Sequence, residues 1–134
     1  MTIQLSVAVR NARLDAIEAT IGTSPTLELR TGAPPANCAA ADTGDVVATL
    51  ALPSNWLADA ASGAKALAGT WEDTSADDDG TVGHFRIKAS GGAVGMQGTV
   101  TETGGGGDMT LQDNEVNAGQ AITITSFGLT DGNA

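Results

Sequence analysis

A chain of 134 residues suits one domain, which at this size buries roughly two-thirds of the surface that its unfolded chain exposes. Its 18 glycines and 41% hydrophobic content fit a turn-rich β domain better than a helical bundle or a disordered chain. The net charge is −10, and residues 67–134 carry ten acids against two bases, so nucleic acid is not an expected partner.

Three features that the sequence lacks limit the compartments in which we expect the protein. No apolar run approaches the roughly 20 residues that a spanning helix needs, so we expect no membrane partner. Cys38 is the only cysteine, so no disulfide forms within the chain. The start of the sequence lacks the basic residues and continuous apolar segment of a signal peptide. These features predict assembly in a reducing cytoplasm.

The first predicted element is an amphipathic helix from Ile3 to Ile21, with Thr2 as its cap and Gly22 at its end. Its apolar residues recur at helical spacing and resemble a short heptad seam. They are Ile3, Val7, Leu14, Ile17 and Ile21. The stripe packs either on the domain's own sheet, which is the simpler alternative, or on a second chain.

Two strands with a long connection follow the helix. Thr26 to Arg30 alternates apolar and polar residues, and Pro34 with Pro35 must end that strand because proline lacks a backbone donor. A loop then runs to Gly44, before the β-branched run from Val46 to Leu52, which predicts a central strand.

The middle of the chain gives weaker patterns. We expect one helical turn over residues 54–58, an exposed connection over 59–66, and another strand over 68–71 with Trp71 in the core. Trp56 is expected to cover one end of that core.

Three alternating runs, divided by glycine-rich turns, predict a β-meander between Gly80 and Leu129. They are Val82–Lys88, Gly95–Thr101 and Ala121–Thr125. A change of phase after the third run indicates a bulge near Ser126, and residues 130–134 read as a free tail.

Counting these elements gives six or seven strands and one helix, with no alternating βα pattern. The predicted fold is mainly β, an antiparallel β-sandwich or small barrel with one N-terminal α-helix. We divide the chain into the N-terminal amphipathic helix, 1–22, and a single antiparallel β domain, 23–134.

Candidate chemistry is sparse, because the chain has one histidine and one cysteine. His84 alternates with Phe85 and Ile87 and is expected on the solvent face of its strand, beside Arg86. Cys38 has no basic neighbour in the sequence to lower its pKa. We therefore expect no enzyme, no zinc site and no cofactor.

The acidic run Asp77, Asp78 and Asp79 is a weak calcium candidate, because hard cations bind converging carboxylates. With Gly80 at the sixth position of an EF-hand loop, Ser75 would stand first and Arg86 twelfth, where carboxylates are required. A solvated acidic loop is the favoured interpretation.

Several short motifs are distributed over nearly the whole chain. They are Asn11-Ala12-Arg13-Leu14-Asp15-Ala16-Ile17-Glu18, Leu29-Arg30-Thr31-Gly32-Ala33-Pro34-Pro35-Ala36, Leu52-Pro53-Ser54-Asn55-Trp56, His84-Phe85-Arg86-Ile87 and Gln97-Gly98-Thr99-Val100. With them the chain resembles a family of small proteins encoded among the virion structural genes of tailed bacteriophages. The resemblance implies a virion protein assembled in the host cytoplasm, and it supplies no catalytic residues.

Three functions compete. The first is a capsid decoration or cement protein that binds across capsid subunits, since a small acidic domain with few aromatic residues gains stability from a lattice. The alternative is a tail, fibre or host-receptor-binding component, and an enzyme ranks third. We expect other virion proteins as partners, either the major capsid protein or tail proteins, and a homo-oligomer. The expected partner-binding residues are Ile3, Val7, Leu14 and Ile17 of the stripe, with Pro34 and Pro35 of the loop.

Overall fold

The computed structural model describes residues 3–132 and confirms the mainly β class with one N-terminal helix, α1 (Val7–Ile21). The strands are β1 (Thr26–Thr31), β2 (Val46–Ala51), β3 (Ala64–Ala66), β4 (Trp71–Asp73), β5 (Gly80–Lys88), β6 (Val94–Glu102), β7 (Met109–Leu111), β8 (Glu115–Val116), β9 (Ile122–Ile124) and β10 (Gly128–Thr130).

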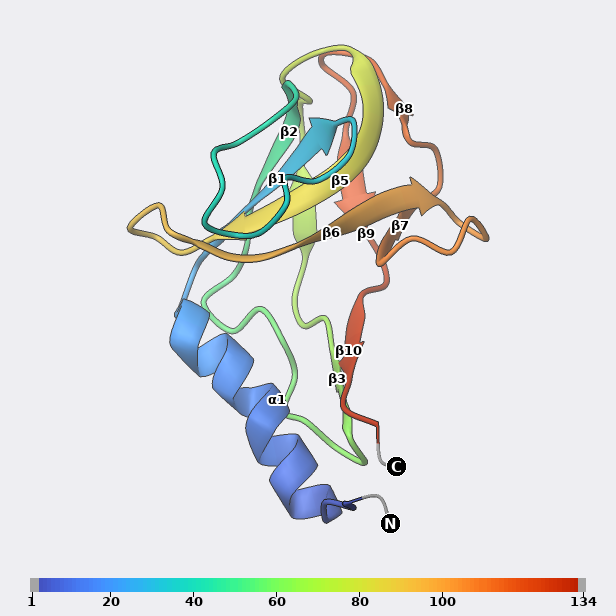
Figure 1. The fold of residues 1–134 in the computed structure, drawn as a ribbon. Coiled ribbons are helices and arrows are strands. Elements are labelled where there is room, and N and C mark those ends of the chain that lie inside the picture. The colour runs from blue at the N-terminus through green and yellow to red at the C-terminus, as the bar shows by residue number, and fades with distance from the viewer. Residues whose placement is uncertain (1–2, 133–134) are drawn as a thin grey trace.

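The largest sheet has the order β2-β1-β5-β6-β7, with β8 also paired to β5, and it curls into a half-barrel (Figure 1). Its pairs are antiparallel except β6 with β7. The pairs β4-β9 and β3-β10 stand outside this sheet. The Asp73 carboxylate accepts a hydrogen bond of 3.0 Å from the Thr49 backbone N–H, so β2 is joined to β4 and the curl continues toward β9.

The predicted meander is only partly correct. β5 and β6 form the expected antiparallel hairpin, but the third run, β9, pairs with β4 instead of β6. The turn over residues 104–107 leads into β7, and β7 occupies the free edge of β6 as a parallel neighbour. That short strand displaces the run that the alternation assigned to this edge.

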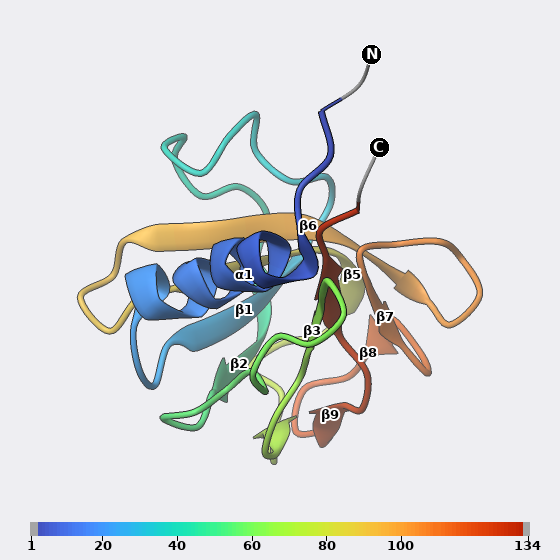
Figure 2. The same ribbon diagram turned by 90° about the horizontal axis from the view of Figure 1, so that it is seen from below.

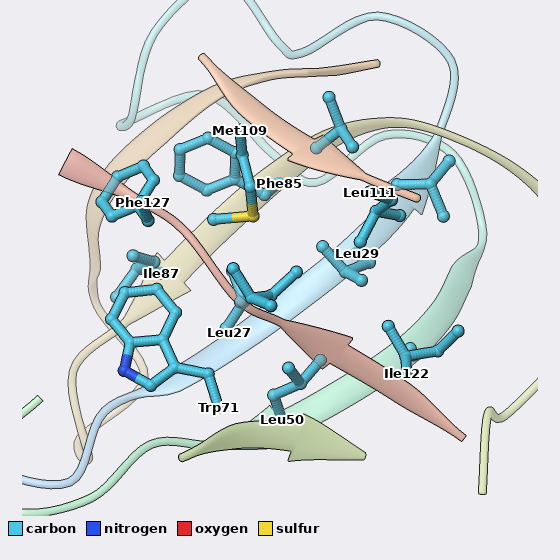
Figure 3. Close-up of a cluster of buried hydrophobic side chains, with 14 of the residues drawn as sticks. Leu27, Leu29, Leu50, Trp71, Phe85, Ile87, Met109, Leu111, Ile122 and Phe127 are labelled. Atoms are coloured by element: carbon cyan, nitrogen blue, oxygen red, sulfur yellow. The ribbon is translucent and has the colours of Figure 1, made fainter. Parts of the chain in front are cut away.

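The interior is formed where the curled sheet meets β4 and β9 (Figure 3). Both tryptophans and both phenylalanines lie there, each at most 7% exposed. The ring centroids of Trp71 lie 6.0 Å from Trp56 and 5.5 Å from Phe127, and Phe127 lies 5.8 Å from Phe85. The few aromatic rings are thus gathered in one cluster, and the core position predicted for Trp71 is confirmed.

Helix α1 begins later than its sequence pattern suggests. Ser6 caps it by accepting a hydrogen bond of 3.2 Å from the Val9 backbone N–H, and Gly22 ends it at a φ of 94°. Thr2, the predicted cap, lies outside the described residues. Ile3 therefore precedes the helix, and the predicted stripe is divided between an extended segment and the helix.

Charged and polar contacts hold α1 against β3. The Lys65 ammonium lies 2.7 Å from the Asp15 carboxylate, and the Asn11 side chain accepts a hydrogen bond of 2.9 Å from the Gly63 backbone N–H. The Trp56 indole donates to the carbonyl oxygen of Gly22 over 3.0 Å. These bonds fix the helix along its length.

Four predictions for connecting and terminal segments are wrong. Residues 54–58 form no helical turn, and the expected exposed connection over 59–66 contains β3, whose Lys65 is 3% exposed. The phase change near Ser126 is no bulge, because the chain passes there from β9 to β10, which pairs with β3. The expected free tail is bound at its start. Thr130 ends β10, and the Asp131 carboxylate pairs with Arg13 at 3.2 Å. Residues 133–134 lie outside the described part of the chain.

Candidate interaction surface

The loop of residues 32–45, called the strap below, folds over the outer face of β1, β5 and β6. Its contacts come from the strand residues whose side chains point away from the core, above all Arg30, Arg86 and Gln97. Because the strap covers them, Arg86 is 1% exposed and His84 is 0% exposed. The prediction of a surface histidine is therefore wrong, although the alternation that placed Phe85 and Ile87 in the core is confirmed.

Arg86 is the centre of this cover. Its guanidinium donates hydrogen bonds of 3.1 Å to the carbonyl oxygens of Asn37, Cys38 and Ala40, and one of 2.5 Å to the Asp42 carboxylate. Its Nε donates to the side-chain oxygen of Gln97 over 3.1 Å. A buried guanidinium with all these acceptors is satisfied, so it fixes the course of the strap backbone.

Asp42 is held by three cations. Its carboxylate lies 2.7 Å from the Lys88 ammonium, 2.5 Å from the Arg86 guanidinium and 3.1 Å from the Arg30 guanidinium. The hydrogen bond from Lys88, followed by that from Arg86, lowers the pKa of Asp42 to about 2. Burial lowers the pKa of Lys88, but its bonds to Asp42 and Glu28 outweigh burial and leave that pKa raised.

This geometry predicts an acid-sensitive strap. The pKa of Asp42 falls from 3.8 to about 2 on folding, so its stabilisation is fully present above pH 3.8 and is lost as the pH falls through about 2. The shift corresponds to about 2 kcal/mol, and since a third of the side chain is exposed we expect about 1 kcal/mol. Urea unfolding of Asp42→Asn should show this loss at pH 7 and little difference from the parent protein below pH 2.

Asp45→Asn is the matched control, because Asp45 lies in the same strap but outside the cluster of cations. Its free energy of unfolding should follow that of the parent protein at neutral pH. A loss at pH 7 of the same size in both variants would show that Asp42 has no special part in holding the strap.

The predicted partner-binding residues are divided by the fold. Ile3 is 83% and Val7 is 47% exposed, whereas Leu14 is 3% exposed and Ile17 packs against the core. Pro34 is half-buried and Pro35 is buried, with its carbonyl oxygen accepting a 2.8 Å bond from the Gln97 amide. Leu14 and Pro35 therefore face their own domain. Val9, 46% exposed, is a residue that the stripe did not include.

The three acidic residues of the calcium candidate bind separate partners. The Asp77 carboxylate accepts a 2.7 Å bond from the Thr49 hydroxyl, and the Asp79 carboxylate accepts one of 2.7 Å from the Ala118 backbone N–H. The Asp78 carboxylate accepts from the N–H of Asp79 over 2.8 Å. Within residues 3–132, no group of three or more histidine, cysteine, aspartate or glutamate side chains is arranged to hold a metal ion.

The one histidine and the one cysteine lie at the strap. His84 has its Nδ1 2.9 Å from the carbonyl oxygen of Gly32, and its Nε2 is buried without a protein partner. Cys38 is half-buried, and its carbonyl oxygen accepts from Arg86. Both residues thus support the attachment of the strap to the sheet.

Among the grooves on the surface of the described residues are two of different character. One, of about 480 Å³, lies between α1 and the turn of the β5–β6 hairpin and is lined mainly by apolar groups such as Ile17, Ala93 and Val94. The other, of about 930 Å³, lies between β7 and β9 and carries several acidic groups. Sequence alone does not indicate the second groove, because β7 is too short to show an alternation.

Comparison with known proteins finds no matching family model, no matching curated protein and no matching solved structure. No helix in residues 3–132 is long and apolar enough to cross a membrane. The surface features described above are therefore the basis for a functional proposal.

Proposed function

We propose that this protein is a non-enzymatic structural protein of a tailed-bacteriophage virion, a decoration or cement protein that binds across capsid subunits. One observation carries the proposal. The large hydrophobic side chains that stand exposed in residues 3–132 are confined to one short segment, at Ile3, Val7 and Val9. Exposed apolar groups gathered in one place are typical of a surface that a partner covers.

The position of this segment favours docking by one end of the molecule. Val7 and Val9 lie in the first turn of α1, which is fixed to its domain by Arg13 and Asn11. The strap and α1 lie on opposite sides of β6 (Figure 2). A helix end seated on a capsid would thus leave the strap free to face outward or toward a neighbour.

Purified protein added to undecorated capsids is expected to bind them and to raise their melting temperature. Val7→Asp should weaken this binding about tenfold or more, since burying a valine contributes about 1.5 kcal/mol or more. An aspartate in the first turn favours the helix dipole, so the variant should stay folded. Thr70→Asp, at an exposed site between β3 and β4, is the matched control.

Absence of binding, with an unchanged capsid melting temperature, would contradict the proposal. Quantitative mass spectrometry of purified virions separates the alternatives. Hundreds of copies per particle fit a coat on the shell, whereas a handful would favour a tail tip, a fibre or a host-receptor-binding component.

A further inference from the structure

Strand β6 is unpaired along part of one edge. Its first edge pairs with β5 from Val94 to Thr99, whereas its second edge pairs with β7 only from Val100 to Glu102. Just before β7, the Asp108 carboxylate accepts a hydrogen bond of 3.0 Å from the Thr99 backbone N–H. Residues 95–98, called the open edge below, make no hydrogen bond from their outward backbone groups to any other segment within residues 3–132.

Gln97 directs its backbone outward from the open edge. The N–H of Thr99 points away from β5, toward Asp108, and residues two apart on a strand point their backbone groups the same way. The N–H and C=O of Gln97 therefore point outward as well, while its side chain is held by Arg86 and Pro35. One residue thus offers both a donor and an acceptor to an added strand.

The edge of the sheet formed by β2 is protected in a way that the open edge is not. There the Thr49 backbone N–H is bound by Asp73, and the carbonyl oxygen of Val47 accepts bonds of 2.7 and 3.2 Å from the N–H groups of residues 77 and 78. Charges, prolines and covering segments are the usual means of protecting an edge strand. The open edge has no charged residue and no proline, and the register shift in its pairing with β5 precedes Gln97. It is therefore suited to pairing with another chain.

An apolar groove adjoins the open edge. It is the groove of about 480 Å³ between α1 and the hairpin turn, and its lining includes Gly95 of the open edge and the neighbouring Val94. Ile17 and Ile21 contribute to its wall from α1. A strand added to β6 would lie between α1 and the strap, which stand on opposite sides of β6 (Figure 2). Its side chains toward α1 would enter an apolar space, where their burial is favourable.

A single charged residue stands among the described residues that line this groove. Arg13 has a side chain that is 60% exposed, and its Nε lies 3.2 Å from the Asp131 carboxylate. No hydrogen bond or ion pair within residues 3–132 occupies the two terminal nitrogens of this guanidinium. A guanidinium binds a second carboxylate through those nitrogens, so the groove favours a segment that carries an acidic group.

We propose that the open edge and this groove form the docking site for a short extended segment of a partner protein. The segment adds as a strand at Gln97 and directs a carboxylate to Arg13. Its apolar side chains pack against Ile17 and Val94. Because β7 occupies the edge from Val100 onward, only a few residues of the segment pair with β6.

The inference deepens the proposed function, on which it rests for the source of the segment, a capsid subunit. A second copy of the chain is less suited, because no acidic residue stands between Lys88 and Glu102 and its own β6 therefore supplies no carboxylate for Arg13. The site itself is tested without a capsid.

A synthetic peptide is the first probe. It is short, acetylated at its amino end, alternates valine with threonine and ends in glutamate. In a nuclear magnetic resonance titration we expect slower exchange of the Gln97 amide, shifts confined to β6 and α1, and a dissociation constant of about 1 mM. The same peptide with proline at its centre lacks the backbone donor and should not bind. Equal binding of the two peptides, or no change at Gln97, would overturn the inference.

Variants of α1 test the groove. Ala16→Glu places a carboxylate in its wall and should weaken peptide binding about tenfold, since it repels the acid of the peptide and reduces apolar burial. Ala19→Glu is the matched control, because Ala19 is exposed on the same helix but does not line the groove. Equal losses in the two variants would mean that the groove is not the site.

Two further variants test the guanidinium. Arg13→Gln and Asp131→Asn both break the same ion pair, but only the first removes the guanidinium. We expect Arg13→Gln to weaken peptide binding about two- to fivefold and Asp131→Asn to leave it unchanged or strengthen it. The opposite ranking would refute the proposed carboxylate contact.

Hydrogen exchange on the capsid separates the inference from the proposed function. The amides of residues 95–98 should exchange about tenfold more slowly in protein bound to capsids. Protein that binds capsids with unchanged exchange there overturns the inference and leaves the proposed function standing, whereas protein that binds the peptide but no capsid does the reverse. Slower exchange that appears on raising the protein concentration alone identifies a second copy as the occupant and also overturns the inference.

Discussion

Arg86→Leu is expected to lower the free energy of unfolding by about 3 to 5 kcal/mol, the cost of removing one partner from a buried charge cluster. The substitution leaves the carbonyl oxygens of Cys38 and Ala40 without their donor, whereas that of Asn37 keeps its bond from the Ala40 N–H. Leucine fills much of the space but supplies no hydrogen bond, and each buried acceptor left unpaired is costly. Urea unfolding measures the loss.

The same variant should release the strap before the rest of the domain unfolds. Cleavage by a protease within residues 32–45 under native conditions is expected to rise, since the strap then has fewer bonds to β5. Limited proteolysis with mass spectrometry identifies the cleaved bonds.

Lys88→Met is the matched control for Arg86→Leu. Lys88 binds the same Asp42 carboxylate, but 18% of its side chain is exposed, and we expect a loss of only about 1 kcal/mol. Equal losses in the two variants would mean that the charge of Asp42 matters and that the carbonyl acceptors of Arg86 do not.

The core strands were predictable because their signal is local. Alternation placed Phe85 and Ile87 inward, and the structure confirms both. The same alternation does not predict the cover on the opposite face of the strand, because the strap residues that contact His84 and Arg86 lie 52 and 46 residues earlier in the sequence. One signal was available: Arg86 and Lys88 are the only two bases after residue 66, and they stand on one face of one strand.

The candidate surface was only partly predictable for a different reason. The spacing of the apolar stripe predicts one helical face, but Ser6 starts the helix after Ile3, so the exposed and buried residues separate along the chain. Thr2 and Ser6 are both acceptable caps, and sequence spacing alone does not choose between them. The groove between β7 and β9 is not predictable from the sequence, because β7, β8 and β9 have two or three residues each, too few to show a period.

Trp71→Ala is expected to lower the free energy of unfolding by about 3 to 5 kcal/mol, as is typical of removing a buried tryptophan. Its ring contacts those of Trp56 and Phe127, and its indole donates to the carbonyl oxygens of Trp56 and Ala68 over 3.2 and 3.1 Å. The substitution therefore removes packing and two hydrogen bonds together. Urea unfolding followed by far-UV circular dichroism measures the change.

Trp71→Phe separates the two contributions, because it keeps a ring beside Phe127 and removes the indole donor. The carbonyl oxygen of Trp56 keeps its bond from the Ala68 N–H, so only that of Ala68 loses its donor. We expect a loss of about 1 to 3 kcal/mol, which is smaller than the loss for alanine. With four aromatic side chains in 134 residues, this cluster holds a large share of the buried area. A loss below about 1 kcal/mol for Trp71→Ala would contradict that view, and stability would then have to come from the aliphatic strands and the strap.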